Sequence, residues 1–241
     1  MDERGDGLTA ANAATARRSR ASAHLGSTLR TILLNPRRGF EAALATISRR
    51  SATGRQPVEG VAPYVLTSIG GAGAMLLWLK IGTLVGIRRI SVADFRWSFV
   101  VATLVGGAVL ALIAQWLWGV VGRAVARDAG SAVRRFVWGA AATPQVLAVI
   151  VLLPLDLLLV GRDTFTATKL TDPLETGWAA MSIALSVSVA LWSGYLFYRG
   201  IQVAGDLRGA AAAAGVTLGL ACAATVIVAV GFGLRLLAGG S

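Results

Sequence analysis

Residues 98–121 read SFVVATLVGGAVLALIAQWLWGVV, a stretch without a single charged side chain. A hydrocarbon core of about 30 Å is crossed by about 20 apolar residues at the helical rise per residue. Four further apolar runs of membrane-crossing length lie at 62–87, 136–161, 177–198 and 209–238. The alternating pattern of a membrane β-barrel is absent, so helices must satisfy the backbone inside the bilayer. The sequence therefore predicts an all-α fold, a polytopic bundle of five transmembrane helices.

The composition supports a membrane protein and argues against a nucleic-acid partner. Of the 241 residues, 55% are hydrophobic and 15% are charged, and the mean hydropathy is +0.67. Soluble domains carry about 25% charged residues. The net charge of +11 comes mostly from arginines beside the apolar runs, which is typical of cytoplasmic loops. Abundant Ala, Arg, Gly and Val with few Lys indicates a GC-rich, bacterial genome.

The distribution of Lys and Arg predicts the orientation. When the N-terminal region and the loops between the five runs are assigned to alternate sides, sixteen basic residues fall on one side and six on the other. Basic residues accumulate on the cytoplasmic side. We therefore expect the N-terminus in the cytoplasm and the C-terminus outside the cell membrane, although Arg88 and Arg89 fall on the outer side.

Three segments are predicted along the chain. Residues 1–24 are rich in Ala, Arg, Ser and Thr without apolar periodicity, which predicts a disordered basic cytoplasmic tail. Residues 25–60 comprise amphipathic helices and a linker. Residues 61–238 form the five-span transmembrane domain.

One amphipathic helix is predicted to begin at Pro36, because Asn35 is a good N-cap and proline suits the first helical position. Its apolar stripe and basic flank consist of Phe40, Ala43, Leu44, Ile47, Arg37 and Arg38. An apolar stripe with basic flanks suits a helix lying in the membrane interface. The alternative is a short helix packed under the bundle.

Lys80 and Asp156 are the two clearest charges inside the apolar runs. A charge near the bilayer centre costs about 2.5–3.5 kcal/mol on insertion scales. Counted from the outer ends of their runs, at about 1.5 Å per residue, the two lie at similar depth on different helices. Three readings remain open: separate contacts with interfacial water, a structural ion pair, or an ion or proton path.

Prolines and small residues give further expectations about packing. Pro144 and Pro154 should kink the third run. Serines in the fourth run (Ser182, Ser186, Ser193), Gly106 and Gly107 in the second, and the GxxxG pair Gly215 and Gly219 in the fifth permit close helix contact. That contact is expected within the chain, and a homo-oligomer is the alternative.

Enzyme and metal signatures are missing from the sequence. It holds no GxSxG, HExxH or P-loop motif, and one cysteine, Cys222, and one histidine, His24. Neither a disulfide framework nor a Cys/His metal site can be built from these. We therefore expect no catalytic residues, no metal and no cofactor.

Three segments resemble the Yip (Ypt-interacting-protein) domain family in its bacterial form. Asn35-Pro36-Arg37-Arg38-Gly39-Phe40 resembles its opening Pro-x-x-x-Phe element. Ala141-Ala142-Thr143-Pro144 resembles its mid-domain helix with an early proline, and Trp192-Ser193-Gly194-Tyr195 its closing segment. The resemblance covers about residues 30–238 and implies a five-span, N-in fold. The chain lacks the acidic N-terminal motif of the eukaryotic members that associate with Rab-type GTPases, so that partnership is not implied.

Two functions follow as hypotheses. The first is a non-enzymatic membrane protein that binds or organises protein partners or lipids, with residues 25–50 as its contact surface. The second is a small transporter or channel subunit that uses Lys80 and Asp156. The expected partners are the lipid bilayer and proteins whose identity the sequence does not give.

Overall fold

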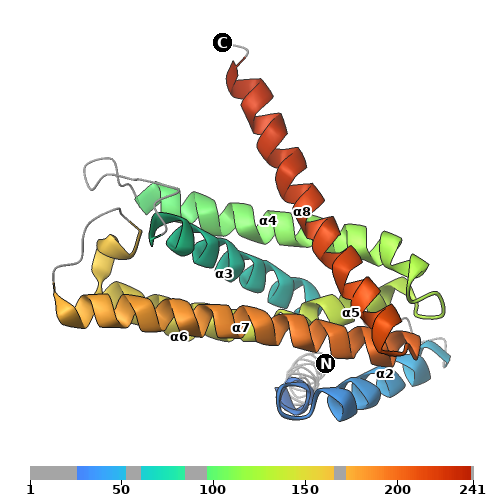
Figure 1. The fold of residues 1–241 in the computed structure, drawn as a ribbon. Coiled ribbons are helices and arrows are strands. Elements are labelled where there is room, and N and C mark those ends of the chain that lie inside the picture. The colour runs from blue at the N-terminus through green and yellow to red at the C-terminus, as the bar shows by residue number, and fades with distance from the viewer. Residues whose placement is uncertain (1–25, 53–60, 85–96, 166–171, 240–241) are drawn as a thin grey trace, which may run out of the picture.

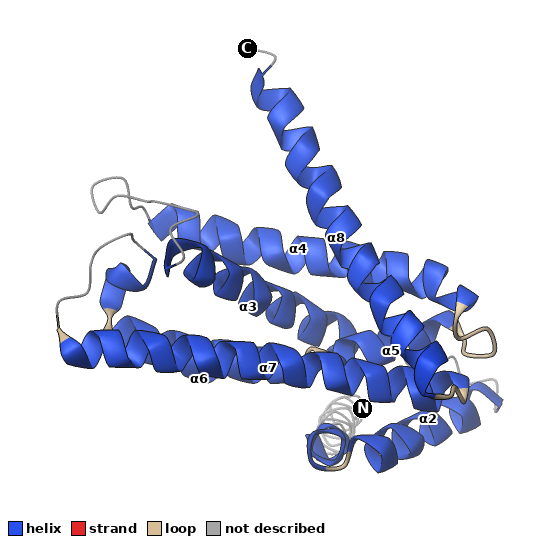
Figure 2. Ribbon diagram, viewed as in Figure 1, coloured by secondary structure: helices blue, strands red, loops and turns tan. Residues whose placement is uncertain are grey.

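The structure is a computed structural model that describes residues 26–52, 61–84, 97–165 and 172–239. The predicted tail at 1–24 lies outside the described residues. All regular structure in the described part is helical (Figure 2), which confirms the all-α class. A helix over 26–34 precedes the following elements: α2 (Pro36–Ala52), α3 (Ala62–Leu84), α4 (Trp97–Val121), η1 (Gly122–Ala124), α5 (Ser131–Ala141), α6 (Thr143–Leu159), η2 (Gly161–Phe165), α7 (Pro173–Gly205) and α8 (Gly209–Gly239).

Four helical stretches are long and apolar enough to cross a membrane: Ala62–Lys80, Trp97–Ala124, Ser131–Leu159 and Pro173–Gly205. They correspond to the first four predicted spans, and by length and composition the chain is a membrane protein. The fifth predicted span lies in α8, whose apolar stretch is shorter over the residues described there, Gly209–Thr225. Figure 1 shows α8 crossing the other long helices obliquely, with its C-terminal half projecting away from them. A fifth span therefore stays a prediction.

Helix α3 lies at the centre of the bundle and contacts α4, α5, α6 and α7 (Figure 1). Glycines permit this close packing. A Cβ built on Gly107 of α4 would lie 2.7 Å from the carbonyl oxygen of Gly71 of α3, so the two backbones touch there. On another side of α3, a Cβ on Gly73 would lie 3.1 Å from the carbonyl oxygen of Gln145. Gly106, the neighbour of Gly107, has nothing within 4 Å of its Cβ position.

The third predicted span is broken rather than merely kinked. Helix α5 ends at Ala141 and α6 begins at Thr143, with Pro144 in its first turn. Proline has no N–H to give to the carbonyl four residues earlier. That carbonyl belongs to Ala140, and the Thr143 hydroxyl donates to it instead, at 2.8 Å. Pro154 lies inside α6 without ending it.

Helix α2 begins at Pro36, as predicted. The carbonyl oxygen of Asn35 accepts the N–H of Gly39 at 2.9 Å, and its side-chain oxygen lies 3.5 Å from the backbone nitrogen of Arg38. A Cβ on Gly39 would lie 2.5 Å from the backbone nitrogen of Ile32, so the 26–34 helix meets α2 at a tight corner.

The apolar face of α2 is covered by the bundle. Phe40 has no exposed surface, and Ala43 is 7% exposed. Phe40 and Ile32 belong to a core cluster with Trp118, Val137, Leu196 and Ile201. Phe40 thus packs against apolar protein surface, as expected for the alternative of a short helix packed under the bundle. The placement of α2 in the membrane interface stays a prediction. Leu44 and Ile47 are partly exposed.

Candidate functional site

The two charges singled out in the sequence form an ion pair inside the bundle. Lys80 lies near the end of α3 and Asp156 near the end of α6, and Lys80 Nζ donates to Asp156 Oδ2 at 2.7 Å. Their exposed fractions are 4% and 5%. Because both side chains are this deeply enclosed, the geometry matches an interhelical pair rather than two separate contacts with interfacial water.

Helix α7 completes the network with two side chains one turn apart. The Ser182 hydroxyl accepts a hydrogen bond from Lys80 Nζ and donates one to Asp156 Oδ1 at 2.6 Å. The indole N–H of Trp178 donates to the same carboxylate oxygen at 2.9 Å. Ser182 has no exposed surface. The network therefore joins three helices, with Ser182 touching both charges.

The short helix η2 covers the network near the end of α6. Its Thr164 hydroxyl donates to the backbone oxygen of Asp156 at 3.3 Å. Phe165 is 1% exposed and packs in a second core cluster with Leu76, Leu79 and Val100. This cover keeps the pair in an apolar surrounding.

The energetics of the network favour a structural role, in which it holds α3, α6 and α7 together. Removing a charge from water costs several kcal/mol, and a buried pair repays that only if its remaining hydrogen-bonding capacity is met. Here the carboxylate accepts from an ammonium, a hydroxyl and an indole. The two formal charges cancel, so the pair itself carries no net charge. Loss of either partner would leave an uncompensated charge in the apolar interior.

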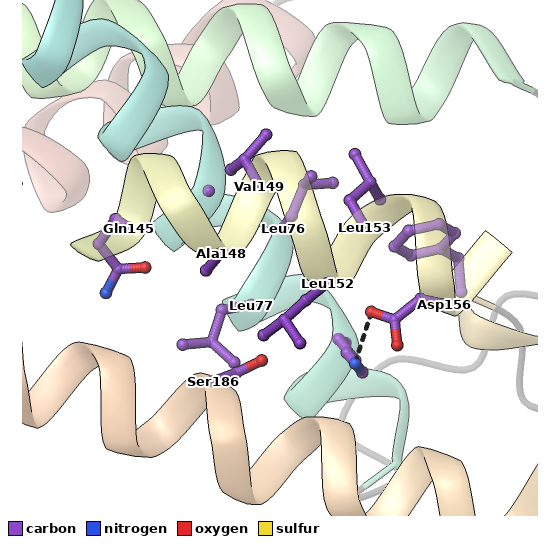
Figure 3. Close-up of a pocket in the computed structure, with 12 residues that line it drawn as sticks. Leu76, Leu77, Gln145, Ala148, Val149, Leu152, Leu153, Asp156 and Ser186 are labelled. Carbon is purple, nitrogen blue, oxygen red and sulfur yellow. Dashed lines mark hydrogen bonds and ion pairs between the residues drawn. The ribbon is translucent and has the colours of Figure 1, made fainter. Parts of the chain in front are cut away.

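A cavity of about 40 Å³ adjoins the pair, between α3, α6 and α7. Figure 3 shows Asp156 at one end of its lining and Gln145 at the other, with aliphatic side chains of α6 between them. Ser186 of α7 contributes a hydroxyl. A water molecule needs about 10–15 Å³ by this measure, so the pocket has room for about three of them.

The opposite end of the bundle is fixed by a buried arginine of α5. Arg134 Nη2 donates to the backbone oxygen of Gly119 at 2.8 Å, and its Nη1 donates to Ala126 at 3.2 Å and to Ala129. Gly119 lies in the last turn of α4, where backbone carbonyls lack helical partners. Arg134 therefore caps α4 and anchors the connection to α5.

This end, here called the basic end, comprises the end of α4, η1, the start of α5, the end of α7, the start of α8, the docked α2 and the 26–34 helix packed with it (Figure 1). Six arginines are exposed there: Arg30, Arg37, Arg38, Arg123, Arg127 and Arg208. The acids described at this end are Glu41, Asp128 and Asp206. At the opposite end Asp163, Asp172 and Glu175 reach the surface. The described part of the molecule is thus polarised along the bundle axis.

The described residues contain no group of three or more His, Cys, Asp or Glu side chains that could hold a metal ion. Cys222 is buried in α8, and His24 lies outside the described residues.

Comparison of the chain with protein-family models, with curated proteins and with solved structures found no match. The likeness to Yip-domain proteins therefore rests on the three sequence elements alone.

Sequence reasoning named Lys80 and Asp156 but missed how α7 joins them. Ser182 was expected only to permit close packing, and Trp178 was not singled out. Their i, i+4 spacing places both on one face of α7, a signal that a search for polar partners of Asp156 could have used.

The GxxxG glycines of α8, Gly215 and Gly219, pack within the chain, against α7. A Cβ on Gly215 would lie 3.1 Å from Ile201, and a Cβ on Gly219 would lie 2.5 Å from Phe197.

Proposed function

We propose that this chain is a non-enzymatic integral membrane protein that gathers anionic lipid headgroups at its basic end. The observation that carries the proposal is the set of six exposed arginines on elements held to one end of the bundle. A basic residue near an anionic membrane surface contributes about 1 kcal/mol. By the positive-inside rule this end faces the cytoplasm. We further propose that this membrane is the bacterial cell membrane and that the chain is of the Yip-domain type.

The docking of α2 supports a lipid-facing role for its polar side. Phe40 holds the helix against the bundle, while the side chains of Arg37 and Glu41 are 73% and 50% exposed. Arg37 and Glu41 form a surface ion pair at 2.9 Å, and such pairs are worth little. Arg37 can therefore exchange Glu41 for a phosphate at small cost.

The lipid hypothesis is tested with the full chain in mixed nanodiscs. Retention of labelled phosphatidylglycerol is measured against labelled phosphatidylcholine for the wild type and for the triple variant Arg30→Gln/Arg37→Gln/Arg38→Gln. We expect selective retention of phosphatidylglycerol in the wild type, reduced by about fivefold for each arginine that contacts a headgroup. Glu41→Gln is the control: it removes a negative charge beside Arg37 and should strengthen the retention of phosphatidylglycerol. Equal retention of the two lipids by the wild type would overturn the proposal. Capture of an acidic protein without lipid selectivity would instead favour a protein partner.

A small transporter or channel subunit is the second candidate, because a charged pair beside a cavity at membrane depth is a recognised mark of transport paths. Replacing Lys80 and Asp156 together by Met and Leu separates the two candidates. Loss of ion or proton flux from proteoliposomes with the fold retained would favour transport. If the wild type shows no flux and the double variant retains lipid as the wild type does, the first proposal is favoured.

A further inference from the structure

Leu34 is a large apolar side chain that is exposed outside the membrane-crossing helices. It is 75% exposed and ends the 26–34 helix, just before α2. Most of the other exposed large apolar side chains belong to the membrane-crossing stretches, where the acyl chains of lipid cover them. The described part of the chain leaves most of Leu34 uncovered. What covers it depends on where this corner of the molecule lies relative to the bilayer.

Exposed tryptophans near the two ends of α4 mark the thickness of the bilayer. Trp97 is 54% exposed and Trp116 is 63% exposed. They are 19 residues apart along α4, which is about 28 Å at the helical rise. A hydrocarbon core is about 30 Å thick, and tryptophan concentrates at its two boundaries. Trp116 therefore marks the boundary at the basic end.

Phe40 of α2 lies at headgroup level, just beyond that boundary. Trp118 follows Trp116 by two residues, and its ring lies 5.1 Å from the ring of Phe197 of α7. Gly200 follows three residues later, and a Cβ on it would lie 3.0 Å from Phe40 Cζ. These steps place Phe40 about 7 Å past Trp116, and a headgroup layer is about 5–8 Å thick. Figure 1 shows α2 on the flank of the bundle, beside the C-terminal part of α7, where lipid borders the protein.

The corner between the 26–34 helix and α2 presents Leu34 among three arginines. Ile32 faces the bundle and has no exposed surface. Leu34 and Arg30 are four residues apart, share another face of the same helix, and are both exposed. Arg37 and Arg38 follow in the first turn of α2 and are exposed as well. An apolar side chain between basic ones matches an anionic leaflet, because the aliphatic group enters the acyl chains while the guanidinium groups meet the phosphates.

We propose that this corner inserts Leu34 into the cytoplasmic leaflet, as the apolar anchor of a headgroup site formed by Arg30, Arg37 and Arg38. The partner is the phospholipid surface that surrounds the bundle. The inference deepens the proposed function and rests on it for the anionic character of the lipid. Leu34 is not part of the apolar stripe of α2, whose Phe40 packs against the bundle.

The test measures the depth of a nitroxide label at position 34 of the full chain in nanodiscs. The label is attached to Leu34→Cys in a Cys222→Ala background, because Cys222 is the one native cysteine. Reference labels are placed at Val109→Cys, which is 50% exposed midway along α4, and at Asp128→Cys, which is exposed before α5. Oxygen dissolved in the lipid and a water-soluble nickel complex each relax an accessible label. We expect nickel accessibility at position 34 to be several times lower than at position 128, with oxygen accessibility approaching that at position 109.

The lipid composition separates this inference from the proposed function. The labels are measured in phosphatidylcholine alone and in a mixture with phosphatidylglycerol, beside the lipid-retention assay. Equal nickel accessibility at positions 34 and 128 in both lipids would overturn the insertion of Leu34, even if phosphatidylglycerol is retained selectively. A label shielded from both oxygen and nickel would show a protein contact and would overturn it as well. A lipid-inserted label in a protein that retains both lipids equally would overturn the proposed function but leave the apolar anchor in place.

Discussion

Lys80 Nζ and Asp156 Oδ2 lie 2.7 Å apart, although 76 residues separate them in the sequence. The contact fixes α3 against α6 near the end of both helices, and Ser182 ties it to α7. Close glycine contacts, such as Gly73 against Gln145, also join α3 to α6, but packing of this kind allows sliding more readily than a directional bond. We interpret the pair as the contact that sets the register of the three helices.

Ser182→Ala should destabilise the bundle by about 1–2 kcal/mol, because it removes a hydroxyl that touches both charges. Ser188→Ala is the matched control on the same helix, since Ser188 is exposed and bonds only to the backbone oxygen of Ala184. Reversible unfolding in mixed micelles measures both. Equal effects of the two substitutions would contradict the role given to Ser182.

Gly107→Ala should destabilise the α3–α4 contact by about 1–3 kcal/mol through overpacking, because its Cβ would lie 2.7 Å from both Gly71 O and Met75 Cβ. The adjacent Gly106→Ala meets nothing within 4 Å and should be neutral, or stabilising by up to about 1 kcal/mol from helix propensity. The same unfolding assay ranks the two. A larger loss for Gly106→Ala would show that α4 is rotated relative to this structure.

Thr143→Val should cost about 1–2 kcal/mol, because it leaves the backbone oxygen of Ala140 without its donor. Pro144→Ala restores an N–H at the position that an unbroken helix would use. Thr143→Val should therefore cost less in the Pro144→Ala background than alone. A double-mutant cycle of unfolding free energies measures this coupling, and a coupling of zero would contradict the compensation.

Arg134→Met should cost about 1.5–3 kcal/mol or more, because several backbone oxygens lose a charged donor. Arg127→Met is the control: Arg127 is exposed in the same connection, and a surface change of this kind usually stays within about 0.5 kcal/mol. Arg134→Lys should not rescue the loss, because an ammonium cannot span the same oxygens as the planar guanidinium fork. Full rescue by lysine would show that only the charge matters.

Much of the fold could be predicted from the sequence, because membrane crossing imposes a simple constraint on length and polarity. Four of the five runs are long apolar helices, and Asn35 with Pro36 located the start of α2. The course of α8 could not be predicted in this way. Apolar length does not say which neighbour a helix packs against, and that depends on contacts such as Gly219 against Phe197.

The candidate site was predictable only as two charges at similar depth. Depth follows from counting residues along each helix, which is why Lys80 and Asp156 could be matched. The direction in which each side chain points depends on helix rotation, and a single sequence does not fix it. The contribution of Trp178 and the burial of Phe40 both depend on that rotation.

The most direct test of the ion pair, on which this account of the bundle depends, is the double-mutant cycle of Lys80→Asp and Asp156→Lys, read as unfolding free energy in bilayer-like micelles. Each single reversal places two like charges in the interior and should cost about 3–5 kcal/mol or abolish folding. The double reversal should recover a substantial part of that loss, because the opposite charges again face each other. A double variant no more stable than the worse single variant would contradict the pair as the contact that holds α3 against α6.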